Sequence, residues 1–253
     1  MAKWAVVTGA SSGIGAEIAR QLAKRGYSLV LTARREERLL ELAKKLKTEC
    51  EIVTADLSVR KECEKLFEAV KNREIEVFIN NAGFGDCSAF ADGDLDKELS
   101  MIDLNVKAMH ILMKLFLQKM QEQERGYILN VASSAGLLPA GPYMATYYAT
   151  KAYVTSLTQA VAQELKETGS KVYVGALCPG PVETEFNAVA NVEFALKGIS
   201  ARSCARYAVD KMLERKVIIV PTLLMKLATT FGHMIPRCLA VQISSNQQKK
   251  KMQ

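Results

Sequence analysis

Short apolar runs rich in β-branched residues alternate along most of the chain with longer segments whose apolar residues recur at helical spacing. The first pair is WAVVT at 4–8 and SGIGAEIARQLAKRG at 12–26, in which Ile14, Ile18 and Leu22 recur every four residues. Helices between strands carry the chain back to the edge where the next strand starts, which builds a parallel sheet. The pattern therefore predicts an α/β fold, a doubly wound Rossmann-like parallel sheet.

The same alternation continues to about residue 221. Further strands are expected at 28–33, 51–57, 77–83, 127–133, 172–180 and 217–221. Further helices are expected at 35–47, 62–70, 97–123, 146–165 and 204–216, with an irregular stretch from 181 to about 200. With 253 residues, no repeat and no linker, we expect one dinucleotide-binding and catalytic domain over 1–220 and a helical basic extension over 221–253.

The net charge of +7 is concentrated at the end of the chain. Residues 206–253 hold nine Lys and Arg against two Asp and Glu, whereas the rest is close to neutral. In that neutral body, basic residues alternate with Glu, as in RREERLLELAKKL at 34–46, which is typical of a solvated helix face. A nucleic-acid partner is therefore not expected.

The extension allows two interpretations. The apolar stretch 217–243 is interrupted by Pro221, Lys226, Pro236 and Arg237, so it has no uninterrupted run of about 20 residues that could span a membrane. Two short helices, near 223–233 and 237–244, precede Lys249, Lys250 and Lys251. They are predicted either to meet an anionic membrane surface or a partner subunit, or to pack on the protein's own sheet.

Metal-ligating patterns are missing from the sequence. The six cysteines form no C-x-x-C pair, and neither of the two histidines has ligands at metal-binding spacing. We expect no metal site. Because the N-terminus opens on a strand-like run without a secretory signal, we expect a cytoplasmic protein, with the extension as a candidate peripheral membrane contact.

A glycine cluster, TGASSGIG at 8–15, lies between the first strand and the first helix. Glycines there allow a tight turn and let backbone N–H groups at the helix N-terminus reach a pyrophosphate. The spacing differs from G-x-G-x-x-G, and no Gly-Lys-Ser/Thr follows, which argues against a nucleoside triphosphatase.

Several other motifs follow in a fixed order along the chain. They are Asp56, NNAG at 80–83, Asn105, NVASSAG at 130–136, Tyr147-x-x-x-Lys151 and PGPVET at 179–184. Together with the glycine cluster, this set resembles the short-chain dehydrogenase/reductase family in its compact form, over nearly the whole chain. The resemblance implies an oxidoreductase that interconverts a carbonyl compound and an alcohol by hydride transfer with a nicotinamide cofactor. A homo-oligomer is the expected assembly.

Tyr147 and Lys151 are four residues apart in a helical pattern, so both project from one helix face. An ammonium there favours the phenolate, so we expect a lowered tyrosine pKa and a side chain that donates and accepts the proton. The resemblance gives Lys151 a second role, a hydrogen bond to the nicotinamide ribose. It gives Asn105 a water relay that returns the proton to Lys151.

Two serines compete for the third catalytic position, in which the resemblance has a serine orient the substrate oxygen. The usual spacing of thirteen before the tyrosine selects Ser134, whereas the local pattern N-x-x-S-x-x-G selects Ser133. We favour Ser133, because the loop 139–142 absorbs a one-residue insertion more easily than the end of a buried strand does.

The end of the second strand predicts the cofactor. It reads Ala33-Arg34-Arg35, with no carboxylate for a ribose 2′-hydroxyl and with a guanidinium for a 2′-phosphate, so NADP(H) is expected. The alternative is that Arg34 and Arg35 only begin a charged helix. The resemblance implies further cofactor contacts from Gly9, Ser11, Ser12, Gly13, Ile14, Gly15, Asp56, Leu57, Asn81, Ala82, Gly83, Pro179, Gly180, Val182 and Thr184, besides Tyr147 and Lys151. Asp56 as a helix N-cap and Thr184 as a loop cap are the structural alternatives.

Apolar residues near these motifs predict a lipophilic carbonyl or alcohol substrate. The expected wall consists of Phe84, Leu137, Leu138, Tyr143, Met144 and the stretch 186–200 with Phe194 and Leu196. The same residues are alternatively core packing. Two other function classes stay open, a catalytically idle dinucleotide sensor and a membrane-surface scaffold. The presence of Asn105, Ser133, Tyr147 and Lys151 together argues against the idle sensor, and turnover would separate the oxidoreductase from both other classes.

Overall fold

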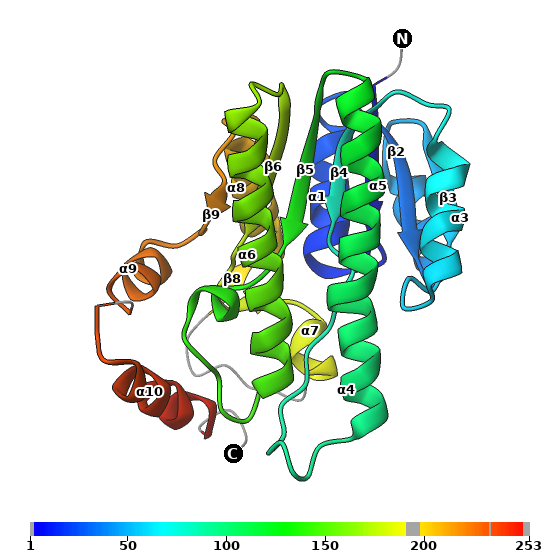
Figure 1. The fold of residues 1–253 in the computed structure, drawn as a ribbon. Helices are drawn as coiled ribbons and strands as arrows, with labels where there is room; N and C mark the ends of the chain where they lie inside the picture. Colours follow the sequence, from blue (N-terminus) through cyan, green and yellow to red (C-terminus); the bar gives the residue numbers. More distant parts are fainter. Residues whose placement is uncertain (1–2, 191–197, 233, 250–253) are drawn as a thin grey trace.

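A seven-stranded parallel sheet forms the centre of the molecule (Figure 1). It is seen in a computed structural model that describes residues 3–190, 198–232 and 234–249. The strand order is β3-β2-β1-β4-β5-β6-β9. The bounds are Trp4–Thr8 (β1), Ser28–Ala33 (β2), Cys50–Thr54 (β3), Ile75–Asn80 (β4), Gly126–Val131 (β5), Val172–Leu177 (β6) and Ile218–Ile219 (β9). The predicted fold class, a doubly wound parallel sheet, is confirmed.

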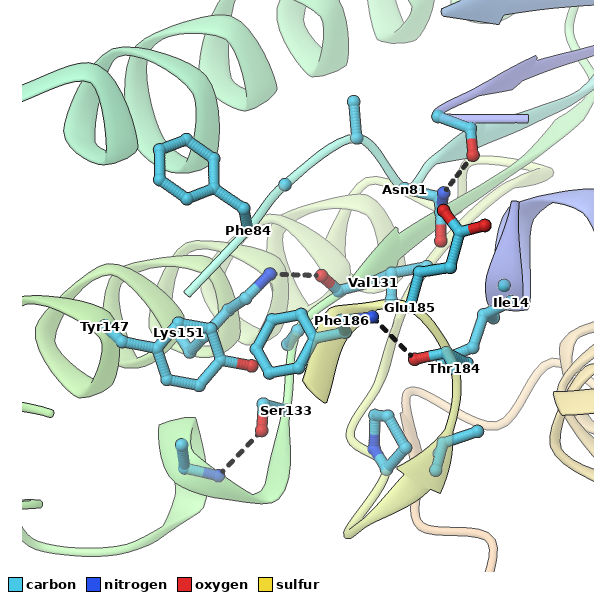
Figure 2. Close-up of a pocket in the computed structure, with 18 of the residues that line it drawn as sticks. Ile14, Asn81, Phe84, Val131, Ser133, Tyr147, Lys151, Thr184, Glu185 and Phe186 are labelled. Atoms are coloured by element: carbon cyan, nitrogen blue, oxygen red, sulfur yellow. Dashed lines mark hydrogen bonds between the residues drawn. The ribbon is translucent and has the colours of Figure 1, made fainter. Parts of the chain in front are cut away.

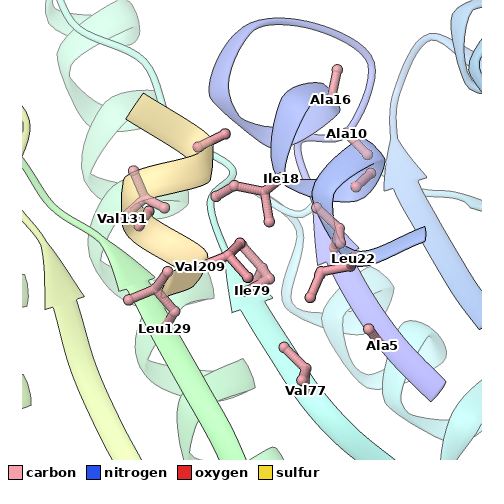
Figure 3. Packing of buried hydrophobic residues seen from close by; sticks show 14 of the residues in the cluster. Ala5, Ala10, Ala16, Ile18, Leu22, Val77, Ile79, Leu129, Val131 and Val209 are labelled. Carbon is pink, nitrogen blue, oxygen red and sulfur yellow. The ribbon is translucent and has the colours of Figure 1, made fainter. Parts of the chain in front are cut away.

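Helices cover both faces of this sheet. One face carries α1 (Gly13–Ala23), α2 (Glu36–Lys45) and α8 (Ala201–Leu213), and the other carries α3 (Arg60–Val70), α5 (Met109–Glu122) and α6 (Ala145–Glu167). Strand β1 contributes Ala5 and Val7 to the first core and Val6 to the second, because successive side chains point to opposite faces. Figure 3 shows the first core, where Ile18 and Leu22 of α1 approach the sheet beside α8.

The helix expected at 97–123 is interrupted. It consists of α4 (Leu95–Ile102), a π-helical segment Asp103–Ala108, and α5. Such single π turns insert a residue into a helix and are frequent at functional sites. Here the π-helical segment contains Asn105, whose side chain is buried.

The stretch expected to be irregular contains short elements. Strands β7 (Val182–Glu183) and β8 (Ile199–Ser200) pair in parallel, and α7 spans Phe186–Val189. Phe194 and Leu196 lie outside the described residues. A 3-10 turn, Ser134–Leu137, follows β5 and packs against α6.

Two helices form the C-terminal extension, α9 (Leu223–Phe231) and α10 (Arg237–Lys249). Figure 1 shows them beyond the β9 edge, on the side where the strands end. Their buried residues are Thr229, Ala240, Ser244 and Gln248. Most of their large apolar side chains are exposed instead: Leu223, Leu224, Leu227, Phe231, Leu239 and Ile243, with Met234 between the helices. None of the helices in the described part of the chain combines the length and the hydrophobicity that a membrane span requires.

Candidate active site

A cavity of about 440 Å³ lies where the central strands end. Its walls come from the loops after β1, β2, β3, β4, β5 and β6, from α6, and from the C-terminal extension. Every residue predicted for catalysis or cofactor binding lines this cavity, except Gly15 and Asn105. The fold thus brings together residues that are up to 175 positions apart, from Gly9 to Thr184.

The glycine cluster forms the floor at the N-terminus of α1. Gly9 and Gly13 have positive φ angles of 64° and 56°, which favour glycine. Ser12 is the N-cap of α1 but makes no side-chain capping bond, so the first amide N–H groups of the helix keep their donors for a ligand. Gly15 does not line the cavity; a Cβ there would lie 2.4 Å from Asn81 Nδ2. Its role in the structure is close packing.

Thr8 and Asn81 lock the loops after β1 and β4 together. Asn81 Nδ2 donates to the Thr8 carbonyl at 2.9 Å and to the Gly9 carbonyl at 3.2 Å. Thr8 Oγ1 accepts from the Asn81 and Ala82 backbone N–H groups at 2.9 and 3.1 Å. Asn81 therefore shapes the cavity floor as well as lining it.

Ser133, Tyr147 and Lys151 converge on one part of the cavity (Figure 2). Tyr147 and Lys151 project from α6, and Ser133 follows β5. Lys151 Nζ donates to the Val131 carbonyl at 2.9 Å and lies 5.8 Å from the centroid of the Tyr147 ring. A hydrogen bond with the Ser133 side chain favours the ionised form of Tyr147. Ser134 also lines the cavity, and its backbone N–H donates to the Pro179 carbonyl at 2.8 Å.

Burial determines the protonation states of Tyr147 and Lys151. It raises the pKa of Tyr147 to about 12, against the smaller opposing effect of Ser133. It also lowers the pKa of Lys151 to about 8. The expectation that Lys151 lowers the tyrosine pKa is therefore wrong for the protein alone, because burial raises that pKa more than the Ser133 hydrogen bond lowers it. At neutral pH Tyr147 holds its proton and is placed to donate it.

Asn105 lies behind the cavity wall. Its Oδ1 accepts from the Phe84 backbone N–H at 3.1 Å, and its Nδ2 donates to the Phe84 carbonyl at 2.8 Å and to Thr150 Oγ1 at 3.2 Å. A Cβ built on Gly83 would lie 2.8 Å from Asn105 Oδ1 and 3.4 Å from Lys151 Nζ, so both polar groups adjoin Gly83. The water relay implied for Asn105 stays a prediction.

Two arginines line the opposite end. Arg34 is exposed there. Arg35, at the N-cap of α2, donates to Ser11 Oγ at 3.1 Å, to Ser12 Oγ at 2.9 Å and to Glu185 at 3.0 Å. Hydrogen bonds from Arg38 and Arg35 hold the pKa of Glu185 below its usual range. Arg35 follows Arg34 directly in sequence, so the turn that predicts the cofactor brings both guanidinium groups to the cavity.

Asp56 and Thr184 have local structural roles in addition to lining the cavity. Asp56 Oδ1 accepts from the Ser58 backbone N–H and hydroxyl at 3.1 and 2.7 Å. It does not cap α3, whose N-cap is Val59. Thr184 Oγ1 accepts from the Phe186 backbone N–H at 3.3 Å, which is the loop cap considered as an alternative.

The expected substrate wall is present in part. Phe84, Leu138, Met144 and Phe186 line the cavity, whereas Leu137 and Tyr143 do not. Sequence reasoning missed Met225 of α9 and Gln247 and Gln248 of α10. No motif marked them, because two glutamines before a lysine run are typical of a solvated tail. Among the described residues, no group of three His, Cys, Asp or Glu side chains could hold a metal ion.

Comparison with known proteins decides the family. The sequence model of the short chain dehydrogenases matches residues 3–193. The chain belongs to the short-chain dehydrogenase/reductase family. An uncharacterized oxidoreductase of Staphylococcus epidermidis is 39% identical over 72% of this chain and 79% of that protein. A very-long-chain 3-oxoacyl-CoA reductase of Rattus norvegicus is 33% identical over 73% of this chain, which spans only 61% of that relative.

Solved structures agree with the fold. A short-chain dehydrogenase from Sphingobium yanoikuyae in complex with NADPH is 28% identical, with a TM-score of 0.82 over 92% of this chain and 93% of that one. A family member from Burkholderia phymatum in complex with NAD is 24% identical, with a TM-score of 0.84 over 97% and 96% of the two chains. The family therefore accommodates both dinucleotides on this fold.

Proposed function

We propose that this protein is an NADP(H)-dependent oxidoreductase that interconverts a lipophilic carbonyl compound and its alcohol. The observation that carries the proposal is the convergence of Ser133, Tyr147 and Lys151 on a cavity that continues to the N-terminus of α1. A catalytically idle dinucleotide sensor has no need for a protonated, buried tyrosine beside a serine and a lysine. The rat relative is named a very-long-chain 3-oxoacyl-CoA reductase, and because a very long acyl chain is apolar, this name supports a lipophilic substrate here.

The cavity floor fits a dinucleotide. A Cβ built on Gly9 would lie 2.6 Å from Asn81 Nδ2 and 3.0 Å from Ala82 Cα, so only glycine gives this close backbone cradle. The uncapped amides of α1 suit a pyrophosphate, and Arg34 with Arg35 suits a 2′-phosphate. When bound, the reduced nicotinamide would supply the hydride.

The protein's own part is proton transfer and orientation. Ser133 and Tyr147 would donate hydrogen bonds to the substrate oxygen, and Tyr147, protonated at neutral pH, would pass its proton to that oxygen as the carbonyl is reduced. Lys151, charged below a pKa of about 8, would stabilise the resulting phenolate. Of the two serines, we assign this role to Ser133, whose side chain hydrogen bonds with Tyr147.

Substitution of the tyrosine tests the proposal. Tyr147→Phe should abolish carbonyl reduction while leaving the Kd for NADPH nearly unchanged, because the phenol moves a proton and adds little to dinucleotide affinity. The matched control is Tyr153→Phe, on the same helix but exposed and hydrogen bonded to His110. Full activity of Tyr147→Phe in a screen of carbonyl compounds would refute the assignment. If Tyr148→Phe were inactive in the same screen, Tyr148 would be the proton donor instead.

We further propose that residues 1–220 form the catalytic unit and residues 221–253 the extension, and that the protein acts in the cytoplasm. The homo-oligomer stays a prediction that sedimentation equilibrium would check.

A second role, peripheral membrane contact, is favoured by the outer face of the extension. This outer face consists of the exposed apolar residues of α9 and α10, among which Leu223, Leu224 and Phe231 are 72%, 62% and 58% exposed. Basic residues Lys226 and Arg237 lie in the same two helices. Apolar side chains flanked by basic charge suit an anionic lipid surface, where each cation contributes about 1 kcal/mol.

Vesicle sedimentation tests this contact. The protein should pellet with anionic vesicles at low ionic strength, stay free with neutral ones, and dissociate as salt screens the charges. Leu223→Glu together with Leu224→Glu should abolish binding, whereas Leu40→Glu, an exposed leucine of α2, should not. If the Leu223→Glu, Leu224→Glu variant still bound anionic vesicles as the wild type does, the membrane role would be refuted. If the same variant lost self-association instead, the outer face would be an interface with a second copy of the chain.

A further inference from the structure

The inner face of α10 is polar, and it reaches the active-site cavity. Its buried residues are Ala240, Ser244 and Gln248, four residues apart and therefore on one side of the helix. Gln248 is 1% exposed and lines the cavity. A long amide side chain is rarely buried to this extent without a full set of hydrogen bonds.

Gln248 has used only part of its hydrogen-bonding capacity. Its Nε2 donates to Tyr148 Oη at 2.6 Å, whereas its buried Oε1 has no hydrogen-bond partner among the residues that the structure describes. A buried acceptor without a partner has lost its hydrogen bonds to water and has gained none in return, so a ligand that donates to it binds more tightly. Reversing the amide would make Tyr148 the donor and would leave the –NH₂ group unpaired, so either orientation leaves an unused polar group at the cavity wall.

Tyr148 completes the arrangement. Its ring is held against Gly141, where a Cβ would lie 2.3 Å from the ring, and it stands edge-on to Tyr147 with 6.4 Å between centroids. Burial raises the pKa of Tyr148, so the phenol stays neutral and keeps its proton. Because its oxygen accepts from Gln248, that proton remains available to a ligand. The pair thus offers one donor and one acceptor.

We propose that Gln248 and Tyr148 form a subsite that binds a hydroxyl group of the substrate, apart from the carbonyl that reacts at Tyr147. This inference rests on the proposed function and narrows its substrate class to hydroxy ketones, or diols in the reverse direction. A hydroxyl both donates and accepts, which matches the pair, whereas a carboxylate only accepts and would face the Gln248 oxygen. Leu138, Met144 and Phe186, which also line the cavity, suit an apolar linker between the two groups.

Matched ketones test the subsite. Straight-chain methyl ketones of six to twelve carbons and their ω-hydroxy analogues would be compared as substrates with NADPH. At the chain length that spans the cavity, the wild type should prefer the hydroxy ketone by about tenfold or more in kcat/KM, because an unpaired acceptor gains its partner. Gln248→Met should bring this ratio to about one, mainly through KM. Gln242→Met, exposed on the same helix, should leave it unchanged.

A binding measurement separates this proposal from the function. Calorimetry would be carried out on the inactive Tyr147→Phe variant with NADPH bound. This variant should bind the hydroxy ketone more tightly than the parent ketone. The added substitution Gln248→Met should remove that difference in affinity. No turnover of any carbonyl compound by the wild type would refute the proposed function. The subsite would be overturned if the protein bound both ketones with equal affinity at every chain length, or if Gln248→Met weakened the binding of both ketones equally. Gln248 would then only anchor α10.

Discussion

Gly136→Ala should impair turnover through a displacement that the structure defines. Gly136 lies in the turn after Ser133, pressed against α6. A Cβ there would lie 2.3 Å from the Lys151 carbonyl oxygen, 2.6 Å from its carbonyl carbon and 2.7 Å from Thr155 Oγ1. Two of these atoms are helix backbone, so no side-chain rotation relieves the clash. The turn and α6 must separate by roughly 0.7 Å to reach even a 3.0 Å contact.

That separation acts directly on the reacting groups, because the turn follows Ser133 and α6 carries Tyr147 and Lys151. A misplacement approaching 1 Å costs on the order of 100-fold in rate, so we expect kcat/KM to fall about 10- to 100-fold. Overpacking of this kind costs about 1–3 kcal/mol, which corresponds to a loss of roughly 2–12 °C in Tm for a chain of this size. Both quantities would be measured on the same preparation, by NADPH absorbance and calorimetry.

Gly26→Ala is the control for lost stability alone. Gly26 has a φ of 83° with nothing within 4 Å of an added Cβ, so alanine there strains the backbone by about 1 kcal/mol far from the cavity. We expect a lower Tm with unchanged kcat/KM. If Gly136→Ala folded with full activity, or if Gly26→Ala lost as much activity, the geometric reasoning would be refuted.

Three further variants test the cofactor site, the lysine charge and the core packing. Arg34→Ala should weaken NADPH binding about 10- to 100-fold with little change for NADH, while Arg60→Ala, exposed on α3, changes neither; equal wild-type affinities for the two cofactors would contradict this. Because Lys151 loses its proton as the pH rises through about 8, kcat/KM for reduction should fall there. The residual activity of Lys151→Arg should not fall in this pH range, because arginine stays charged. A flat pH profile of the wild type would argue against a charged lysine. Phe116→Ala, which removes a ring stacked 3.9 Å from Phe78, should cost about 3–5 kcal/mol in unfolding by denaturant, and a loss under 1 kcal/mol would contradict the packing.

The sheet and the cavity floor were predictable because each depends on local sequence. Strands such as 4–8 are apolar at every position except the last, Thr8, since both faces of a parallel strand are covered. The loop at 8–15 has glycines where the backbone takes positive φ or approaches Asn81 closely. Because all these loops follow strands that run in one direction, they meet at one edge of the sheet, and motifs distant in sequence come together there.

The interruption at Asn105 and the charge state of Tyr147 were not predictable in this way. Periodicity over 95–122 is helical throughout, and a π turn shifts it by only one residue. The tyrosine pKa depends on how completely the final packing excludes water, which a spacing of four residues does not show. Local pattern therefore predicted which groups come together, while tertiary burial determines their protonation.

Helix α10 shows why the extension was the part least accessible to sequence reasoning. An amphipathic helix is expected to bury its apolar residues, yet Leu239 and Ile243 are each 44% exposed while Ser244 and Gln248 are buried. The reason is the surface beneath it, which is a cavity rim with a phenol to be paired and not a hydrocarbon core. If the outer face lies on lipid and Gln248 binds the substrate hydroxyl, a lipophilic hydroxy ketone dissolved in that lipid would enter the cavity beside α10. The extension would then be the part of the protein that delivers the substrate to Tyr147.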